Sequence, residues 1–246
     1  MEIFLNAEKV GQIGSFVITN TLVASTCVVL FLVIVAIKIF RSGYDIKNRF
    51  YNFAEMLIEG FMSIIEGVVG RGIVAKQIFG VIVTFFLFVI FNNWFGIFPG
   101  MGSVGIKEVE EGKEVFVPLL RSANSDLNMT LAIALVSVCF IQIIAIKNIG
   151  IKSYLHKFFN FTNPILCFVG LLEIISELVK IFSFSFRLFG NIFAGDVLLI
   201  VMFSLVPWIA PIPFMGIEMF AGFIQALIFS MLTLVFIKVS VSHEEY

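Results

Sequence analysis

Long apolar runs alternate with short polar connections along this chain. A helix rises about 1.5 Å per residue, and a run must cover a hydrocarbon core of ~30 Å to cross a bilayer. Runs of that length are 16–40, 77–98, 127–146, 164–206 and 213–237. The pattern predicts five hydrophobic helical segments and therefore an all-α polytopic membrane protein.

A different pattern follows the first run. Apolar residues recur there at helical spacing, while acidic residues share another face of the same segment. The apolar positions are Phe50, Phe53, Leu57, Phe61, Ile64 and Val68, and the acidic ones are Glu55, Glu59 and Glu66. This segment is predicted to be an amphipathic helix that lies on the membrane surface or against a partner.

Composition agrees with a membrane protein and narrows the function. Of 246 residues, 60% are hydrophobic and 13% charged, and the mean hydropathy is +1.07, whereas a soluble domain carries about 25% charged residues. The net charge of −1, without a basic tract, excludes nucleic acid as an expected partner. The three cysteines show neither disulfide nor metal-binding spacing, so we expect no metal and no cofactor. We expect residues 1–246 to form a single integral membrane domain.

Loop charges predict the orientation of the chain. Basic residues follow the first and third apolar runs, while acidic residues dominate the 99–126 connection. The basic residues are Lys38, Arg41, Lys47, Arg49, Lys147, Lys152 and Lys157, and the acidic ones are Glu108, Glu110, Glu111 and Glu114. Positive loops stay on the cytoplasmic side, or on the matrix side in a mitochondrion. The N-terminus, the acidic loop and the 207–213 turn are therefore expected outside, and residues 243–246 inside.

The run 164–206 is too long for a straight crossing. As one helix it would extend about 64 Å, roughly twice the hydrocarbon thickness, so we expect it to be strongly inclined. Gly190 and Gly195 would allow a bend or the close approach of a neighbour. Three prolines between 207 and 213 break the chain, which predicts a long tilted antiparallel hairpin with the last segment, 213–237.

Arg187 lies near the centre of this long segment. A guanidinium stays protonated in proteins, and holding it at bilayer depth costs at least ~2.5–3.5 kcal/mol. Snorkelling to the interface suits residues near the ends of a helix rather than its middle. Arg187 is therefore predicted to face a polar pathway or an exchangeable partner.

Polar residues around Arg187 form a stripe along one helix face, because they are spaced by three or four residues. The stripe consists of Ser176, Lys180, Ser183, Arg187 and Asn191. Asp196 is nine residues beyond Arg187, which places it on the opposite side of the helix and ~13 Å away along the axis. One helix would thus offer a fixed cation to one environment and a titratable carboxylate to another.

The expected hairpin brings residues of its two helices together. With the turn centred near residue 206 or 207, Gln225 is level with Arg187 and Glu218 is level with Asp196. Two carboxylates at one intramembrane site repel each other, which favours a pair that binds and releases a proton. The alternative is that these groups only hold helices together, although such contacts usually use neutral Ser, Asn or Gln.

Four polar residues lie near the outer ends of the second and third runs. They are Asn92, Asn93, Asp126 and Asn128. Such residues line an aqueous entrance, or they cap helices and sit at the membrane interface, and the sequence supports both roles equally.

Residues 183–199, SFSFRLFGNIFAGDVLL, resemble the signature of subunit a of F-type ATP synthases. Similarity to that family extends to NNWFGIFPG at 92–100, PLLRSANSDLNMTLAIAL at 118–135 and GFIQALIFSMLTLVF at 222–236. With the order of the spans, the resemblance covers essentially the whole chain. Lys180 and Ile181 stand where the family often has Arg-Pro, which leaves the local bend before Arg187 open, and Asp196 replaces a commoner Glu.

The resemblance implies a role for each candidate site residue. Arg187 would be the essential stator arginine, Gln225 its neighbour, and Asn191, Asp196 and Glu218 members of the ion pathway. Candidates for the lining of the half-channels are Asp126, Asn128, Asn93, Glu173 and Ser183.

The resemblance also implies a mechanism and partners. Two offset aqueous half-channels would exchange protons with carboxylates of a rotor ring of c subunits, and Arg187 would favour the ionised form of each arriving carboxyl. Peripheral stalk b subunits, the remaining ATP synthase subunits and membrane lipid are the other implied partners, and the chain would catalyse nothing alone. The expected location is a bacterial plasma membrane or an organelle inner membrane.

Two other classes of protein are the alternatives. A secondary ion transporter would need a matched second half and paired interrupted helices, which the sequence lacks. A structural membrane anchor would not need Arg187, Asp196 and Glu218 at bilayer depth.

Overall fold

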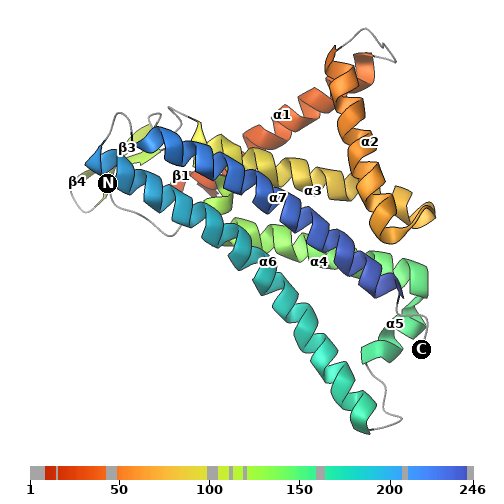
Figure 1. Ribbon diagram of the computed structural model, residues 1–246. Coiled ribbons are helices and arrows are strands. Elements are labelled where there is room, and N and C mark those ends of the chain that lie inside the picture. The colour runs from red at the N-terminus through yellow and green to blue at the C-terminus, as the bar shows by residue number, and fades with distance from the viewer. Residues whose placement is uncertain are drawn as a thin grey trace.

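Helices dominate the computed structural model, which describes residues 9–14, 16–42, 49–98, 105–110, 113–118, 121–158, 164–206 and 210–242 (Figure 1). The helices are α1 (Asn20–Ser42), α2 (Arg49–Val69), α3 (Ile73–Ile97), the 3-10 turn η2 (Ala123–Ser125), α4 (Leu127–Ile149), α5 (Ile151–Phe158), α6 (Pro164–Leu205) and α7 (Pro211–Ser242). Two antiparallel hairpins pair β1 (Lys9–Ile13) with β2 (Phe16–Thr19) and β3 (Gly105–Glu110) with β4 (Lys113–Pro118).

Among the described residues, four helices are long and apolar enough to cross a membrane, namely α1, α3, α4 and α7. They arise from four of the five predicted runs, and the fifth run forms α6, a single helix of 42 residues. The predicted amphipathic segment forms α2, with Phe61 and Ile65 buried and Phe53 and Met56 exposed. The all-α polytopic fold class is therefore confirmed.

The first run forms a helix later than predicted. The run was expected to be helical from residue 16, but residues 16–19 pair with residues 9–13 as a strand. Val17, Ile18 and Thr19 are β-branched and favour extended backbone, and the helix begins at Asn20, whose Oδ1 accepts the amide of Thr21 at 2.9 Å.

The polar connections hold more structure than the sequence predicted. The acidic connection contains the hairpin of β3 and β4, with Ile106 opposite Val117, and the basic connection after α4 contains α5. Periodicity gives a weak signal over elements this short. Residues 207–209 of the predicted 207–213 turn, the basic residue Lys47 and the C-terminal residues 243–246 lie outside the described residues, while α7 already begins at Pro211.

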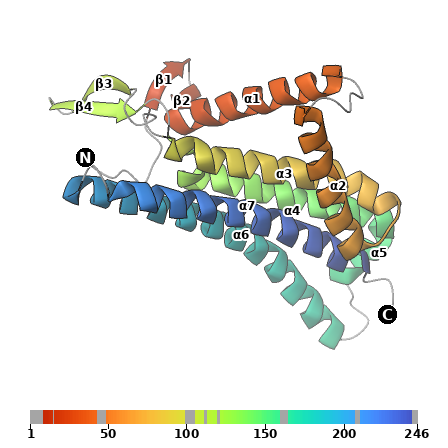
Figure 2. The ribbon, with the colours of Figure 1, turned by 45° about the horizontal axis from the view of Figure 1, so that its top comes forward.

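The core sits where α7 packs along α3 and α4, and α6 packs along α4 and α7. Its central cluster includes Val89, Ala134, Leu188, Ala226 and Phe229, each with at most 1% of its surface exposed. Helix α1 lies over α3 on the side away from α6 (Figure 2). These buried contacts fix the register between α6 and α7.

Helix α6 runs beside α7 from about Lys180 onward, since the ammonium of Lys180 lies 4.8 Å from the ring centroid of Phe236. Figures 1 and 2 both show its N-terminal half leaving the bundle at an angle, toward α5. The first half of α6 is therefore inclined to the other long helices, whereas its inclination to the membrane stays a prediction.

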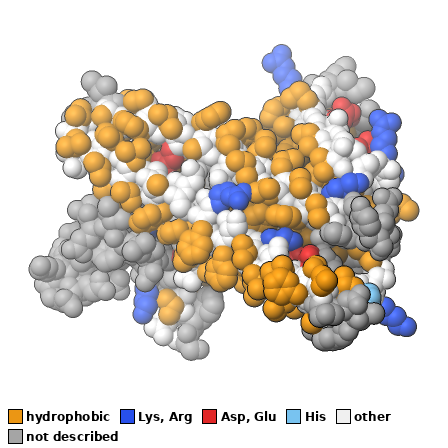
Figure 3. Space-filling view, turned by 60° about the horizontal axis from the view of Figure 1, so that its bottom comes forward, with side chains coloured by type: hydrophobic (Ala, Val, Ile, Leu, Met, Phe, Trp, Pro, Cys, Tyr) orange, Lys and Arg blue, Asp and Glu red, His pale blue; other side chains and the backbone are white. Residues whose placement is uncertain are grey.

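The surface is largely apolar. Figure 3 shows hydrophobic side chains spread over most of the drawn face, with a few charged groups between them. On α6 alone, Phe168, Leu178, Val179, Phe182 and Phe186 are each more than half exposed. Patches of this extent mark contact with lipid or with a partner protein.

Candidate functional site

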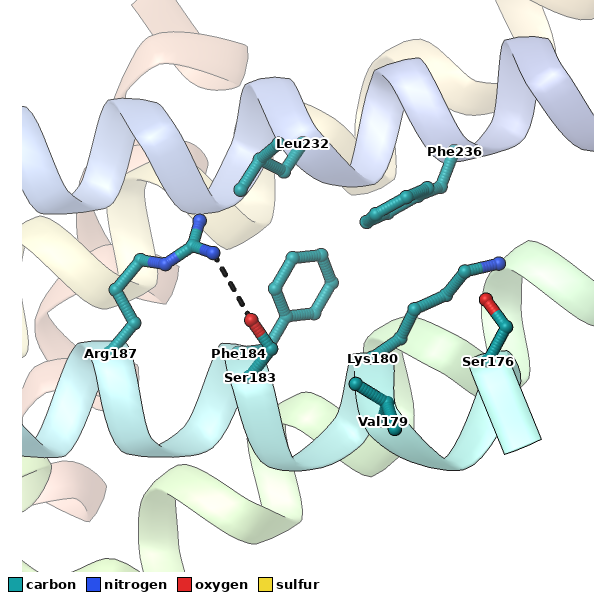
Figure 4. A pocket seen from close by; sticks show the side chains of 8 residues that line it. All are labelled: Ser176, Val179, Lys180, Ser183, Phe184, Arg187, Leu232 and Phe236. Atoms are coloured by element: carbon teal, nitrogen blue, oxygen red, sulfur yellow. Dashed lines mark hydrogen bonds between the residues drawn. The ribbon is translucent and has the colours of Figure 1, made fainter.

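Arg187 lies on the exposed face of α6 that adjoins α7. Its Nη2 donates a 3.1 Å hydrogen bond to Oγ of Ser183, one turn earlier. Figure 4 shows the guanidinium extending toward α7, near Leu232. No described carboxylate forms an ion pair with it. The charge of Arg187 is therefore held in place yet available to a partner from outside.

An open groove of about 240 Å³ runs along α6 at this point. Its lining is mixed, with the polar stripe on one side and apolar residues of both helices on the other. The lining residues are Ser176, Val179, Lys180, Ser183, Phe184, Arg187, Leu232 and Phe236.

The register of the hairpin follows the sequence-based expectation to within one residue. Phe184 packs on Phe229 with ring centroids 5.0 Å apart, and Gly195 lies against Glu218. Position 187 is therefore level with position 226, next to the expected Gln225. The Gln225 side chain is buried, with 7% of its surface exposed, whereas Arg187 is exposed. Asn191 is half-buried.

Asp196 and Glu218 lie close together and interact electrostatically. Glu218 is 6% exposed, and both of its carboxylate oxygens are buried without a hydrogen-bond donor among the described residues. The contact depends on Gly195, because a Cβ there would lie 2.5 Å from Oε1 of Glu218. A buried carboxylate without donors is costly when ionised, which suits a group that takes up a proton.

Two residues that the sequence did not single out complete the surroundings of Asp196. Ser125 and Arg121 both act on its carboxylate, and the hydroxyl of Ser125 donates to the carbonyl of Ser122 at 2.8 Å. Nε of Arg121 also donates to Oγ of Ser125 at 3.0 Å. We call Arg121, Ser125, Asp196 and Glu218 the outer cluster, after the side on which the loop charges place it. Arg121 lies in segment 118–135, whose resemblance to the subunit a family was the sequence signal that could have identified it.

The predicted entrance residues near the outer cluster are engaged in hydrogen bonds. Nδ2 of Asn93 donates to the carbonyl of Gly222 at 2.9 Å, and Oδ1 of Asn93 accepts from Asn124 at 2.6 Å. Asp126 caps α4, accepting the amide of Asn128 at 3.0 Å, and also accepts the hydroxyl of Thr21 at 3.3 Å.

These contacts join the outer ends of α1, α3, α4 and α7. The side chain of Asn128 is exposed, and Nδ2 of Asn92 bonds back to the carbonyl of Phe88 at 2.8 Å. The capping role is therefore present at Asp126.

A second set of polar residues lies where α4, α5 and the first half of α6 meet. Nε2 of Gln142 donates to Oε2 of Glu177 at 2.5 Å, and Nζ of Lys180 donates to Oε1 of Glu177 at 2.7 Å. The hydroxyl of Tyr154 donates to Oε1 of Gln142 at 2.5 Å. We call these four residues the inner cluster. Of the four, only Tyr154 lies outside the long helices α4 and α6.

The Tyr154 hydroxyl is held in its protonated form. Burial raises the pKa of Tyr154 above its ordinary value of 10.0, and the negative charges of Glu177 and Glu173 raise it further. Glu173, a predicted lining residue, is half-buried and acts on the inner cluster in this way. Sequence reasoning missed Gln142 and Tyr154, although a glutamine within an apolar helix was an available signal.

Within the described residues, no group of three or more His, Cys, Asp or Glu side chains could hold a metal ion. The site is instead a line of charges along α6. It runs from the inner cluster through Arg187 to the outer cluster. An exposed arginine lies in the middle of a long helix, with a separate polar cluster on each side of it. This arrangement is that of an ion-translocating membrane subunit.

Comparison with known proteins identifies the family. The sequence profile described as ATP synthase A chain matches residues 19–238. A protein named ATP synthase subunit a from Campylobacter curvus (strain 525.92) is 31% identical over 221 residues, which cover 89% of this chain and 90% of that protein. The protein of the same name from Campylobacter jejuni subsp. jejuni serotype O:23/36 is 32% identical, with 89% and 88% covered. That from Moorella thermoacetica is 27% identical, with 93% and 94% covered.

The chain belongs to the ATP synthase subunit a family. It is a proton-translocating stator subunit of the membrane sector and is part of the ATP synthase complex. Its helices place it as a multi-pass protein in a bacterial plasma membrane.

Proposed function

We propose that Arg187 is the fixed cation that exchanges with carboxylates of a rotor ring of c subunits, and that two half-channels meet the ring on either side of it. The observation that carries this proposal is the exposed guanidinium of Arg187, which has no acidic partner among the described residues. A charge kept at bilayer depth without a partner is costly unless one arrives from outside.

The outer half-channel would pass through the outer cluster. Glu218 has two buried oxygens without donors, and Asp196 lies beside it, so the pair can hold and release a proton. Asn93 and Asp126 join the helices that surround this region, while Asn191 and Gln225 lie between the outer cluster and the level of Arg187.

The inner half-channel would open along the groove on α6. Ser183 and Arg187 line this groove, and Glu173 lies on α6 just before the first lining residue, Ser176, and acts on Tyr154 of α5. Phe184, Leu188 and Phe229 separate the two polar clusters, and each is at most 2% exposed. With apolar packing between the half-channels, a proton would cross only by riding on a rotor carboxylate. Transit would therefore require rotation.

The further partners follow from the same arrangement. The tilted hairpin of residues 164–237, within the single membrane domain 1–246, would face the rotor. Peripheral stalk b subunits would hold the chain against rotation, and exposed apolar residues of α2 such as Phe53 and Met56 offer a surface for them or for lipid.

The test is Arg187→Ala in the assembled complex. ATP synthesis in vesicles under an imposed proton gradient should fall on the order of 10²-fold or more, because the stabilising charge is removed. Passive proton flow should appear, since nothing then separates the half-channels electrostatically. Assembly is checked by co-purification with the ring and the ATPase head. An assembled Ala variant that synthesised ATP at the wild-type rate would refute the proposal.

A further inference from the structure

Helix α6 carries two cations in the same groove, Lys180 and Arg187. They are seven residues apart, which is about 10 Å along a helix axis. That distance is about one Debye length at 0.1 M salt, and screening is weaker still where water is excluded. A rotor carboxylate attracted by Arg187 would therefore also be attracted by a free ammonium at Lys180.

The structure keeps Lys180 from acting as a free cation. Its Nζ lies 2.7 Å from Oε1 of Glu177, and both side chains are nearly buried, at 14% and 13% exposure. The ammonium also lies 4.8 Å from the ring centroid of Phe236. Figure 4 shows Lys180 extending toward Ser176 and away from Arg187. The pair of Glu177 and Lys180 is thus neutral and points away from the position of exchange.

Glu177 is itself held from the opposite side. Its second oxygen accepts from Nε2 of Gln142, and the amide of Gln142 is oriented by the hydroxyl of Tyr154. Because the Tyr154 hydroxyl donates to Oε1 of Gln142, the NH₂ group is turned toward Glu177, where it can donate. Donors occupy both oxygens of Glu177, in contrast to Glu218, whose oxygens have none among the described residues.

We propose that Glu177 is a positioning residue that neutralises and immobilises Lys180, so that Arg187 is the single uncompensated cation of α6 that a rotor carboxylate meets. This inference rests on the proposed function of Arg187. It assigns the inner cluster to the control of charge in the groove rather than to proton transfer.

The test begins with Glu177→Gln in the complete ATP synthase. The substitution keeps the size of the side chain and frees the charge of Lys180. ATP synthesis at a fixed proton gradient should fall about tenfold with normal assembly, because the groove then holds two competing cations. Glu66→Gln is the matched control, since Glu66 also pairs with a base, Arg71 at 3.1 Å, but lies on α2. The control should synthesise ATP at the wild-type rate.

The decisive variant is Glu177→Gln with Lys180→Met. Removing both charges restores a groove with Arg187 alone, so at least half of the lost rate should return. A purely structural role for Glu177 or a proton-carrying role would leave the double variant as slow as Glu177→Gln. Either that result or a wild-type rate in Glu177→Gln alone would overturn the inference.

A charge-swapped variant tests the same inference if Glu177→Gln assembles poorly. Glu177→Lys with Lys180→Glu keeps a neutral pair and should synthesise ATP within about threefold of wild type, because the net charge of the groove is unchanged. A slower assembled swap would count against neutralisation. Failure of this inference is distinguishable from failure of the proposed function, since these variants retain Arg187, whereas Arg187→Ala retains the pair of Glu177 and Lys180.

Discussion

The outer and inner clusters use similar residue types in opposite ways. In the outer cluster, Glu218 is 6% exposed and its two oxygens lack donors among the described residues, while the nearest charged group on α6 is a second acid, Asp196. In the inner cluster, both oxygens of Glu177 accept hydrogen bonds, and the nearest charged group is a base, Lys180.

The difference separates carboxylates that can exchange a proton from one that is held in place. Two acids that act on each other electrostatically favour a proton on one of them, because both cannot ionise without repulsion. An acid between an ammonium and an amide has its charge matched and its orientation fixed. Location on the long helices alone does not distinguish these two kinds of carboxylate, since Glu177, Asp196 and Glu218 all lie on α6 or α7.

The largest effect is expected from changing the charge that lies between the clusters. Arg187→Lys keeps a positive charge but replaces a planar fork that cannot deprotonate with a compact ammonium that loses its proton when desolvated. ATP synthesis in vesicles should fall on the order of 10²-fold, nearly as far as in the Ala variant. Lys238→Arg, an exchange between the same residue types on α7, is the control. A rate above half of wild type in Arg187→Lys would mean that charge alone suffices.

Removing both outer acids should have the next largest effect. Asp196→Asn with Glu218→Gln should slow gradient-driven ATP synthesis about 30-fold with the complex assembled, within the range for positioned acid–base groups. Each single variant should be milder, because the remaining acid still binds a proton. Proton flux into reconstituted vesicles measures the step directly. A wild-type flux in the double variant would remove the outer cluster from the pathway.

A smaller effect is expected from crowding the outer pair without changing its charge. Gly195→Ala places a Cβ 2.5 Å from Oε1 of Glu218. Glu218 must then move, and ATP synthesis should fall roughly five- to tenfold, since misplacement of a reacting group by about 1 Å is costly. Adding Glu218→Asp, a shorter acid, should recover part of the rate. Gly216→Ala is the control, because nothing lies within 4 Å of a Cβ there. Equal rates for the two Ala variants would contradict the observed contact.

The smallest effect should come from Tyr154→Phe in the inner cluster. It removes one hydrogen bond, worth about 0.5–1.5 kcal/mol, and leaves every charge of the groove in place. ATP synthesis should fall about twofold or less, with a lower thermal stability of the purified complex. A larger loss than in Glu177→Gln would show that the hydrogen bond from Tyr154 to Gln142 matters more than the ion pair of Glu177 and Lys180.

The pH dependence of the same contact has a definite sign. Because the pKa of Tyr154 is raised in the folded protein, the protonated hydroxyl stabilises the fold fully below pH 10.0, its ordinary pKa. This contribution is lost as the pH rises through the raised pKa. Thermal unfolding measured between pH 9 and pH 11 should show a decline attributable to Tyr154 that is absent in the Phe variant.

Several features were predictable because they depend on residues close in sequence or on one simple geometry. Apolar runs determined the long helices, and the antiparallel hairpin placed Glu218 beside Asp196 through constant rise per residue. The mid-helix position of Arg187 predicts a functional charge, and that role stays a prediction. The first helix was predicted four residues too early, because local β propensity and pairing with residues 9–13 outweighed hydropathy.

The amino-acid sequence by itself determined the membrane class, the order of the helices and the charges that α6 carries. Only the tertiary structure decided which of these charges are compensated. Gln142 of α4 donates to Glu177, Tyr154 of α5 donates in turn to Gln142, and Arg121 acts on Asp196 from the segment before α4. The physical reason is that helical periodicity assigns a side chain to a face, whereas hydrogen bonds and ion pairs depend on which distant helix packs against that face.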